Sequence, residues 1–213
     1  MKNWILYIVL LISIPVIAQN KVDASKDSIG FPVKKITGFV SAITEVNFTR
    51  LNTSNSSGFA GGVRFSDKFL IGIYGVGLLT GLKASDFNSI KPIADYNVTF
   101  SHGGFLFSFK SKTIKNVSFF NTLKLGYGSL FLQSPYINLD YNLARDEVLV
   151  ITPGFDTEIF ITDWVKLNLG VGVRFIKGLS VAFVDVNGSK IPYYESSALE
   201  GANLSFSIIF GSF

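Results

Sequence analysis

Apolar and polar residues alternate along most of the chain after residue 34, and a period of two is typical of β-strands. In the clearest case Val165, Leu167 and Leu169 alternate with Lys166 and Asn168. Eight segments show the pattern or a glycine-rich form of it: residues 35–48, 59–66, 69–80, 102–110, 116–132, 148–161, 165–176 and 202–213. Most of these predicted strands have one apolar face and one polar face.

The connections between these segments alternate between short and long. The short ones are residues 66–68, 110–116 and 162–164, and the long ones are 49–58, 81–101, 133–147 and 177–201. All short turns would then lie at one end of a meander, as in transmembrane β-barrels. In lipid, only a closed barrel lets a sheet pair all its backbone N–H and C=O groups. The predicted fold is all-β: an eight-stranded antiparallel up-and-down transmembrane β-barrel.

Composition fits a membrane location. Of the 213 residues, 48% are hydrophobic, 15% aromatic and only 16% charged, and the mean hydropathy is +0.40. After the first twenty residues, no apolar run is long enough for a spanning helix. The net charge of +4 is too small, and the lysines too scattered, to indicate a nucleic-acid partner. The absence of cysteine excludes disulfides, thiolate zinc sites and cysteine nucleophiles.

The N-terminus reads MKNWILYIVLLISIPVIAQN, with a positive Lys2, an apolar run and small residues before Gln19. This is the pattern of a secretory signal peptide, residues 1–18, cut after Ala18. The alternative is a membrane anchor, but the run is shorter than the ~20 residues that span a bilayer, and it contains Pro15. We expect residues 19–34 to form a periplasmic lead-in and residues 35–213 the outer-membrane barrel.

Single charged residues interrupt the strands opposite the apolar face. They are Glu45, Arg64, Lys124, Asp156, Glu158, Lys166 and Arg174. In an eight-stranded barrel the interior is just wide enough to be filled by side chains, and buried charges need partners. We therefore predict a structural network of ion pairs in the lumen and no open pore; the alternative is a narrow polar conduit. In a soluble lipocalin-like ligand-binding barrel, the same charges would face water.

The chain offers little catalytic chemistry. His102 is the only histidine, and Ser101 beside it must point to the opposite face of a strand. No Gly-x-Ser-x-Gly elbow supports a serine nucleophile. One histidine and no cysteine leave no transition-metal site, and no motif indicates a cofactor. We predict a non-enzymatic protein, with an outer-membrane lipid-modifying enzyme that uses His102 as base as the alternative.

Three stretches resemble small outer-membrane β-barrel proteins of the Bacteroidota type. They are ITPGFDTE at 151–158, WVKLNLGVGVR at 164–174 and LEGANLSFSIIFGSF at 199–213. The resemblance implies export to the outer membrane, contact with its lipid, and a structural or adhesive role or a role in a secretion or assembly system. It identifies no specific protein partner. We expect a monomer whose long loops face the outside and carry any contacts.

In similar proteins a terminal aromatic residue is recognised by the barrel-insertion machinery, so the resemblance implies that Phe213 is an insertion signal. Leu204, Phe206 and Phe210 lie on the apolar face of the last strand, but Phe213 is in the other phase, with Ile209. Either a β-bulge near residue 211 shifts the register, or Phe213 lies outside the strand ladder.

Overall fold

The computed structural model describes residues 36–49, 53–65, 68–79, 82–83, 97–133, 145–178, 182–184, 190–192 and 199–213. The predicted signal peptide and lead-in, residues 1–34, lie outside these ranges. Among the described residues, none belongs to a helix long and apolar enough to cross a membrane.

Eight long strands form the molecule, as predicted. They are β1 (Ile36–Thr49), β2 (Thr53–Phe65), β3 (Phe69–Leu78), β5 (Asn97–Ile114), β6 (Val117–Gln133), β7 (Arg145–Phe160), β8 (Val165–Lys177) and β11 (Gly201–Gly211). Within the described ranges three short strands accompany them. β4 (Leu82–Lys83) pairs with β5, while β9 (Ala182–Val184) and β10 (Lys190–Pro192) pair with each other.

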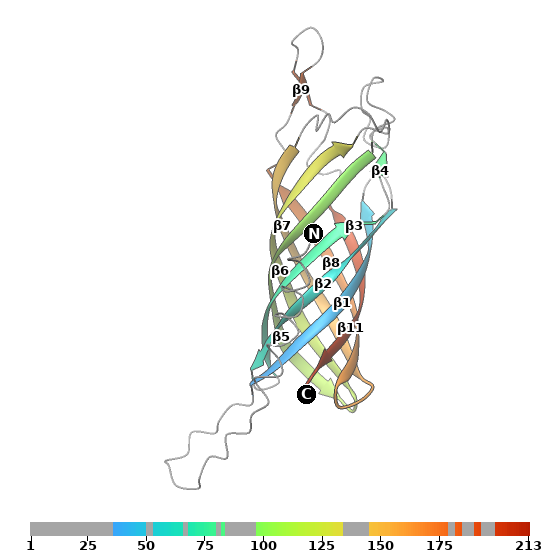
Figure 1. Cartoon of the computed structure of the whole chain (residues 1–213). Coiled ribbons are helices and arrows are strands. Elements are labelled where there is room, and N and C mark those ends of the chain that lie inside the picture. The colour runs from blue at the N-terminus through green and yellow to red at the C-terminus, as the bar shows by residue number, and fades with distance from the viewer. Residues whose placement is uncertain are drawn as a thin grey trace, which may run out of the picture.

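The long strands close into a barrel (Figure 1). Each pairs antiparallel with its chain neighbours, and β1 pairs with β11 from Phe39↔Gly211 to Thr49↔Gly201. Closure leaves no long strand with a free edge. The fold class is therefore a closed eight-stranded antiparallel barrel. We call the end with the C-terminus and the β2–β3, β5–β6 and β7–β8 connections the turn end, and the opposite end the loop end.

Two strands begin at least five residues earlier than predicted. β2 starts at Thr53, so only residues 50–52 separate it from β1, and the expected long loop at 49–58 is wrong. β5 starts at Asn97 and shortens the expected loop at 81–101. In the added part of β2, Ser54 and Ser56 face inward and Asn55 faces outward. Because both faces are polar there, hydrophobic alternation gives no signal, although the backbone pairs with β1 in regular register.

Large apolar side chains cover the outer face over most of the barrel's height. Phe59, Ile73 and Phe105 are 73%, 61% and 59% exposed. We call these exposed apolar side chains of the outer face the apolar belt; its members occur on all eight long strands. On five strands the directly paired outward positions toward the loop end are small or polar: Ser57, Gly77, Ser101, Ser129 and Glu147. They form a row across the apolar outer face, and beyond this row Leu79 and Phe131 are apolar residues in the outward phase.

The lumen side of β5 to β8 becomes apolar toward the loop end. The inward side chains there include a group that is almost fully buried: Val98, Phe100, Leu130, Val148, Val150 and Ile176. On the β1–β2 side of the same end the buried inward residues are polar, Asn47, Ser54 and Ser56, and Asp146 on β7 is buried as well. One side of the loop end therefore has an apolar interior beside a polar outer row, like a soluble barrel. The sequence prediction did not include this inversion.

Candidate functional site

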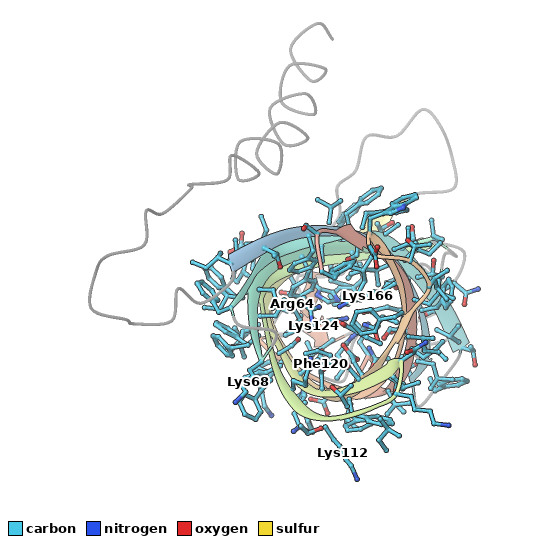
Figure 2. All side chains as sticks on the ribbon, turned by 90° about the horizontal axis from the view of Figure 1, so that it is seen from below. Arg64, Lys68, Lys112, Phe120, Lys124 and Lys166 are labelled. Carbon is cyan, nitrogen blue, oxygen red and sulfur yellow. The ribbon has the colours of Figure 1, made fainter. Side chains whose placement is uncertain are left out.

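The seven predicted lumen residues all lie on inward positions of the strands. Glu45 lies on β1, Arg64 on β2, Lys124 on β6, Asp156 and Glu158 on β7, and Lys166 and Arg174 on β8. The view along the barrel shows Arg64, Lys124 and Lys166 inside the ring of strands (Figure 2). Four salt bridges join six of the seven into two clusters.

Glu45 is the centre of the first cluster. Its carboxylate is 1% exposed and accepts from Lys124 Nζ at 2.5 Å and from Arg174 Nη2 at 3.0 Å. Arg174 also donates to Asn47 Oδ1, and Asn47 Nδ2 donates to Ser56 Oγ at 2.9 Å. β1, β2, β6 and β8 contribute to this cluster, so it links opposite sides of the barrel wall.

Glu158 is the centre of the second cluster. Its two carboxylate oxygens accept separately from Arg64 Nη2 at 2.7 Å and from Lys166 Nζ at 3.3 Å. All three side chains are buried. Asp156, the seventh residue, forms no salt bridge with the described residues; its carboxylate accepts a hydrogen bond from Asn168 Nδ2 at 3.3 Å.

Aromatic rings cover the cations of the second cluster. The Arg64 guanidinium carbon lies 5.2 Å from the centroid of Phe120 and 5.6 Å from that of Phe213. Lys166 Nζ lies 4.0 Å from the Phe160 ring and 3.8 Å from the Phe213 ring. A cation over a ring face is attracted by the ring quadrupole, more strongly where water is excluded.

Phe213 lies beyond the strand ladder. β11 ends at Gly211, and its pairing with β1 runs without a register shift, so no bulge explains the phase of Phe213. The Phe213 side chain packs against the buried apolar cluster that contains Phe39 and Ile209. The Phe213 ring therefore lies inside the lumen at the turn end.

Sequence analysis missed these aromatic contacts. Phe120 follows Phe119, and only Phe120 shares the phase of Ser118 and Thr122, which face inward. A single aromatic residue in the polar phase of a strand was the available signal. Its charged partner Arg64, on a distant strand, could not be identified without the barrel's geometry.

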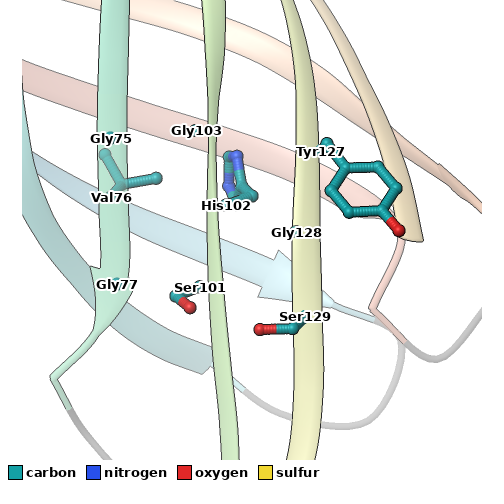
Figure 3. Close-up of a pocket in the computed structure, with 9 residues that line it drawn as sticks. All are labelled: Gly75, Val76, Gly77, Ser101, His102, Gly103, Tyr127, Gly128 and Ser129. Atoms are coloured by element: carbon teal, nitrogen blue, oxygen red, sulfur yellow. The ribbon is translucent and has the colours of Figure 1, made fainter. Parts of the chain in front are cut away.

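His102 does not form a catalytic pair with Ser101. The imidazole is buried on the lumen side, with Nδ1 3.1 Å from Tyr74 Oη and the ring 5.1 Å from Phe100. Ser101 belongs to the outward row. A groove of about 540 Å³ over β3, β5 and β6 includes both residues in its lining, together with Gly75, Gly103 and Tyr127 (Figure 3). Among the described residues, no group of three or more acidic or histidine side chains could hold a metal ion.

Comparison with known proteins identifies the fold. No protein-family model matches the chain, and no curated protein matches it in sequence. Among solved structures, Neisserial surface protein A matches with a TM-score of 0.51 at 11% identity, over 82% of this chain and 96% of that one. This likeness shows that the chain has the fold of small outer-membrane barrels.

Two further structures match with lower scores. The N-terminal β-barrel domain of Pseudomonas aeruginosa OprF matches with a TM-score of 0.48 at 10% identity, over 84% of this chain and 98% of that one. Ail, the attachment invasion locus protein of Yersinia pestis, matches with a TM-score of 0.48 at 9% identity, over the same shares.

Proposed function

We propose that the protein is a non-enzymatic integral outer-membrane β-barrel with a closed lumen, whose loop-end segments carry its contacts with other molecules. The observation that carries the proposal is the separation of the two faces. Large apolar side chains are exposed on the outer face, while the mid-strand charges lie inside, six of them in salt bridges. This distribution suits a lipid exterior and a packed polar interior.

The same distribution argues against a soluble periplasmic ligand-binding barrel. Such a barrel would keep its apolar side chains inside and its charges in water. Here Phe59, Ile73 and Phe105 would be left in water, and soluble monomers rarely expose a large continuous apolar surface.

A lipid-modifying enzyme has weaker support. The only histidine is turned into the lumen toward Tyr74, and the neighbouring serine faces the other way, so these two residues form no nucleophile–base contact.

The salt bridges and aromatic rings of the lumen fit a packed interior better than a transport path, because the opposite charges are paired and buried.

Within the proposed class, a structural or adhesive role, or a part in a secretion or assembly system, fits a rigid barrel with long connections at one end. The Bacteroidota-type resemblance, the signal peptide, the monomeric state and recognition of Phe213 by the insertion machinery belong to the same proposal. The long connections, above all those within residues 81–101 and 177–201, would face the outside; residues 84–96, 134–144 and much of 179–198 lie outside the described ranges.

The test combines membrane behaviour with conductance. We expect the folded protein to require detergent or lipid, to migrate differently on gels before and after heating, and to give no porin-like conductance in planar bilayers. A monomer that stays soluble without detergent would contradict the membrane location. Steady porin-like currents would contradict the closed lumen.

A further inference from the structure

Three exposed lysines lie at the turn end of β3 and β5: Lys68, Lys112 and Lys115. We call them the basic rim. A fourth lysine, Lys110, is half-buried and faces the lumen, where its Nζ lies 5.8 Å from the centroid of the Phe120 ring. The backbone N–H of Lys110 donates to the carbonyl of Lys68 at 2.7 Å, which ties the two segments together. Lys68 and Lys112 point away from the barrel, unlike Arg64 and Lys166 inside it (Figure 2).

A β-bulge directs Lys112 outward. Lys110 pairs with Phe120, but Lys112 pairs with Phe119, so the register shifts at Ser111. Phe120 faces the lumen, and Phe119 is on the outer face. Directly paired residues share a face, so Lys112 lies on the outer side, where regular alternation would have placed Ser111. The Ser111 hydroxyl donates to the Phe119 carbonyl at 3.1 Å at this point.

The basic rim directly adjoins the apolar belt. Phe69, next to Lys68, pairs with Phe109, and both rings are exposed on the outer face. Ile114, between Lys112 and Lys115, is 49% exposed. Lysine side chains at such a border lay their methylenes on apolar surface and extend the ammonium into the headgroup layer.

The charge of the basic rim is not neutralised within the described part of the chain. None of its three lysines forms a salt bridge with a described residue. Asp67, next to Lys68 in sequence, lies outside the described ranges; even with it, residues 66–68 and 111–116 hold three lysines against one carboxylate.

We propose that the basic rim binds the headgroups of anionic phospholipids in the leaflet that meets the turn end. The inference rests on the proposed membrane location and goes beyond it by naming the lipid class and the place. Charge complementarity and continuity with the apolar belt select a lipid surface as the occupant. Each lysine near an anionic surface contributes roughly fivefold to binding, and salt screens the attraction.

A tryptophan inside the basic rim, quenched by brominated lipids, reports which lipids surround it. With Trp4 replaced by Phe, Trp164 in the β7–β8 connection is the single tryptophan, beside Asp163 at the same end. Adding Trp164→Phe and Ile114→Trp moves the single tryptophan into the basic rim. Both proteins are reconstituted in mixed phosphatidylglycerol–phosphatidylcholine vesicles, with one of the two lipids brominated.

At low salt we expect the quenching of the tryptophan at position 114 to show at least a fivefold preference for phosphatidylglycerol over phosphatidylcholine in the lipid around it. The quenching of Trp164 should show no preference. Lys68→Gln, Lys112→Gln and Lys115→Gln together should abolish the preference, as should 0.5 M salt (roughly a 4 Å screening length), whereas the triple arginine variant should keep it.

Equal quenching by the two lipids at position 114 would overturn the proposal, and would leave an acidic protein as the occupant that fits the charge. Equal preference at positions 114 and 164 would also overturn it. If neither tryptophan is quenched by any brominated lipid, the membrane location itself fails, so the two failures are distinguishable.

Discussion

At the scale of single residues, two buried carboxylates organise the lumen. Glu45 and Glu158 each accept from two cations that come from different strands. A buried charge is costly without partners, so each carboxylate offsets the cost of burying two cations. The sequence supported the prediction that these residues face inward, since each interrupts an alternating strand. It could not predict which acid would meet which base.

Removing the Glu45 charge should therefore destabilise the barrel strongly. In Glu45→Gln, Lys124 and Arg174 stay buried without a carboxylate, which costs about 3–5 kcal/mol of unfolding free energy. Denaturant unfolding in lipid vesicles measures the change. Asp163→Asn, in the exposed β7–β8 connection, is the matched control, with an expected change within about 0.5 kcal/mol. Equal losses in the two variants would contradict a structural role for the Glu45 cluster.

At the scale of the strands, alternation predicted well where one face is apolar and the other polar. β8 and β11 follow their predicted spans within about one residue at the start and two at the end. The early part of β2 was missed because serine, threonine and asparagine occupy both faces. The apolar lumen at the loop end was missed because Val148 and Val150 adjoin the outward Leu149, so that alternation disappears there. A period of two is visible in the sequence only where the two faces of a strand differ in polarity, and both of these regions lack that difference.

Glycines on inner strand positions bring neighbouring strands close together. A Cβ on Gly104 would lie 2.1 Å from the Leu125 carbonyl oxygen and 2.6 Å from Gly126 Cα, whereas a Cβ on Gly75 would meet nothing within 4 Å. Gly104→Ala should therefore lower the unfolding free energy by about 1–3 kcal/mol, because backbone must move. Gly75→Ala should be neutral or stabilising by up to about 1 kcal/mol. A similar loss in both variants would show that close packing is not the reason for Gly104.

At the scale of the whole molecule, the barrel has a main pattern and a partial reversal of it at one end. Over most of its height, an apolar outer face surrounds a charged lumen. At the loop end of β5 to β8, small and polar residues such as Ser101 and Ser129 lie outside, and Phe100 and Ile176 lie inside. This part of the loop end can pack in water, whereas the rest of the barrel can pack in lipid. In the proposed membrane location, the row through Ser101 and Ser129 marks where the barrel leaves the hydrocarbon layer.

Cysteine labelling on β5 tests that border. Ser101 and Phe105 are outward positions four residues apart, about 13 Å at ~3.3 Å per residue, and the chain has no native cysteine. In lipid vesicles accessible from both sides, Ser101→Cys should react with a membrane-impermeant maleimide and Phe105→Cys should not. In detergent-free denaturant both should react, which controls for the thiol itself. A soluble barrel would label at both positions without denaturant, and a border nearer the tip of the loop end would protect both.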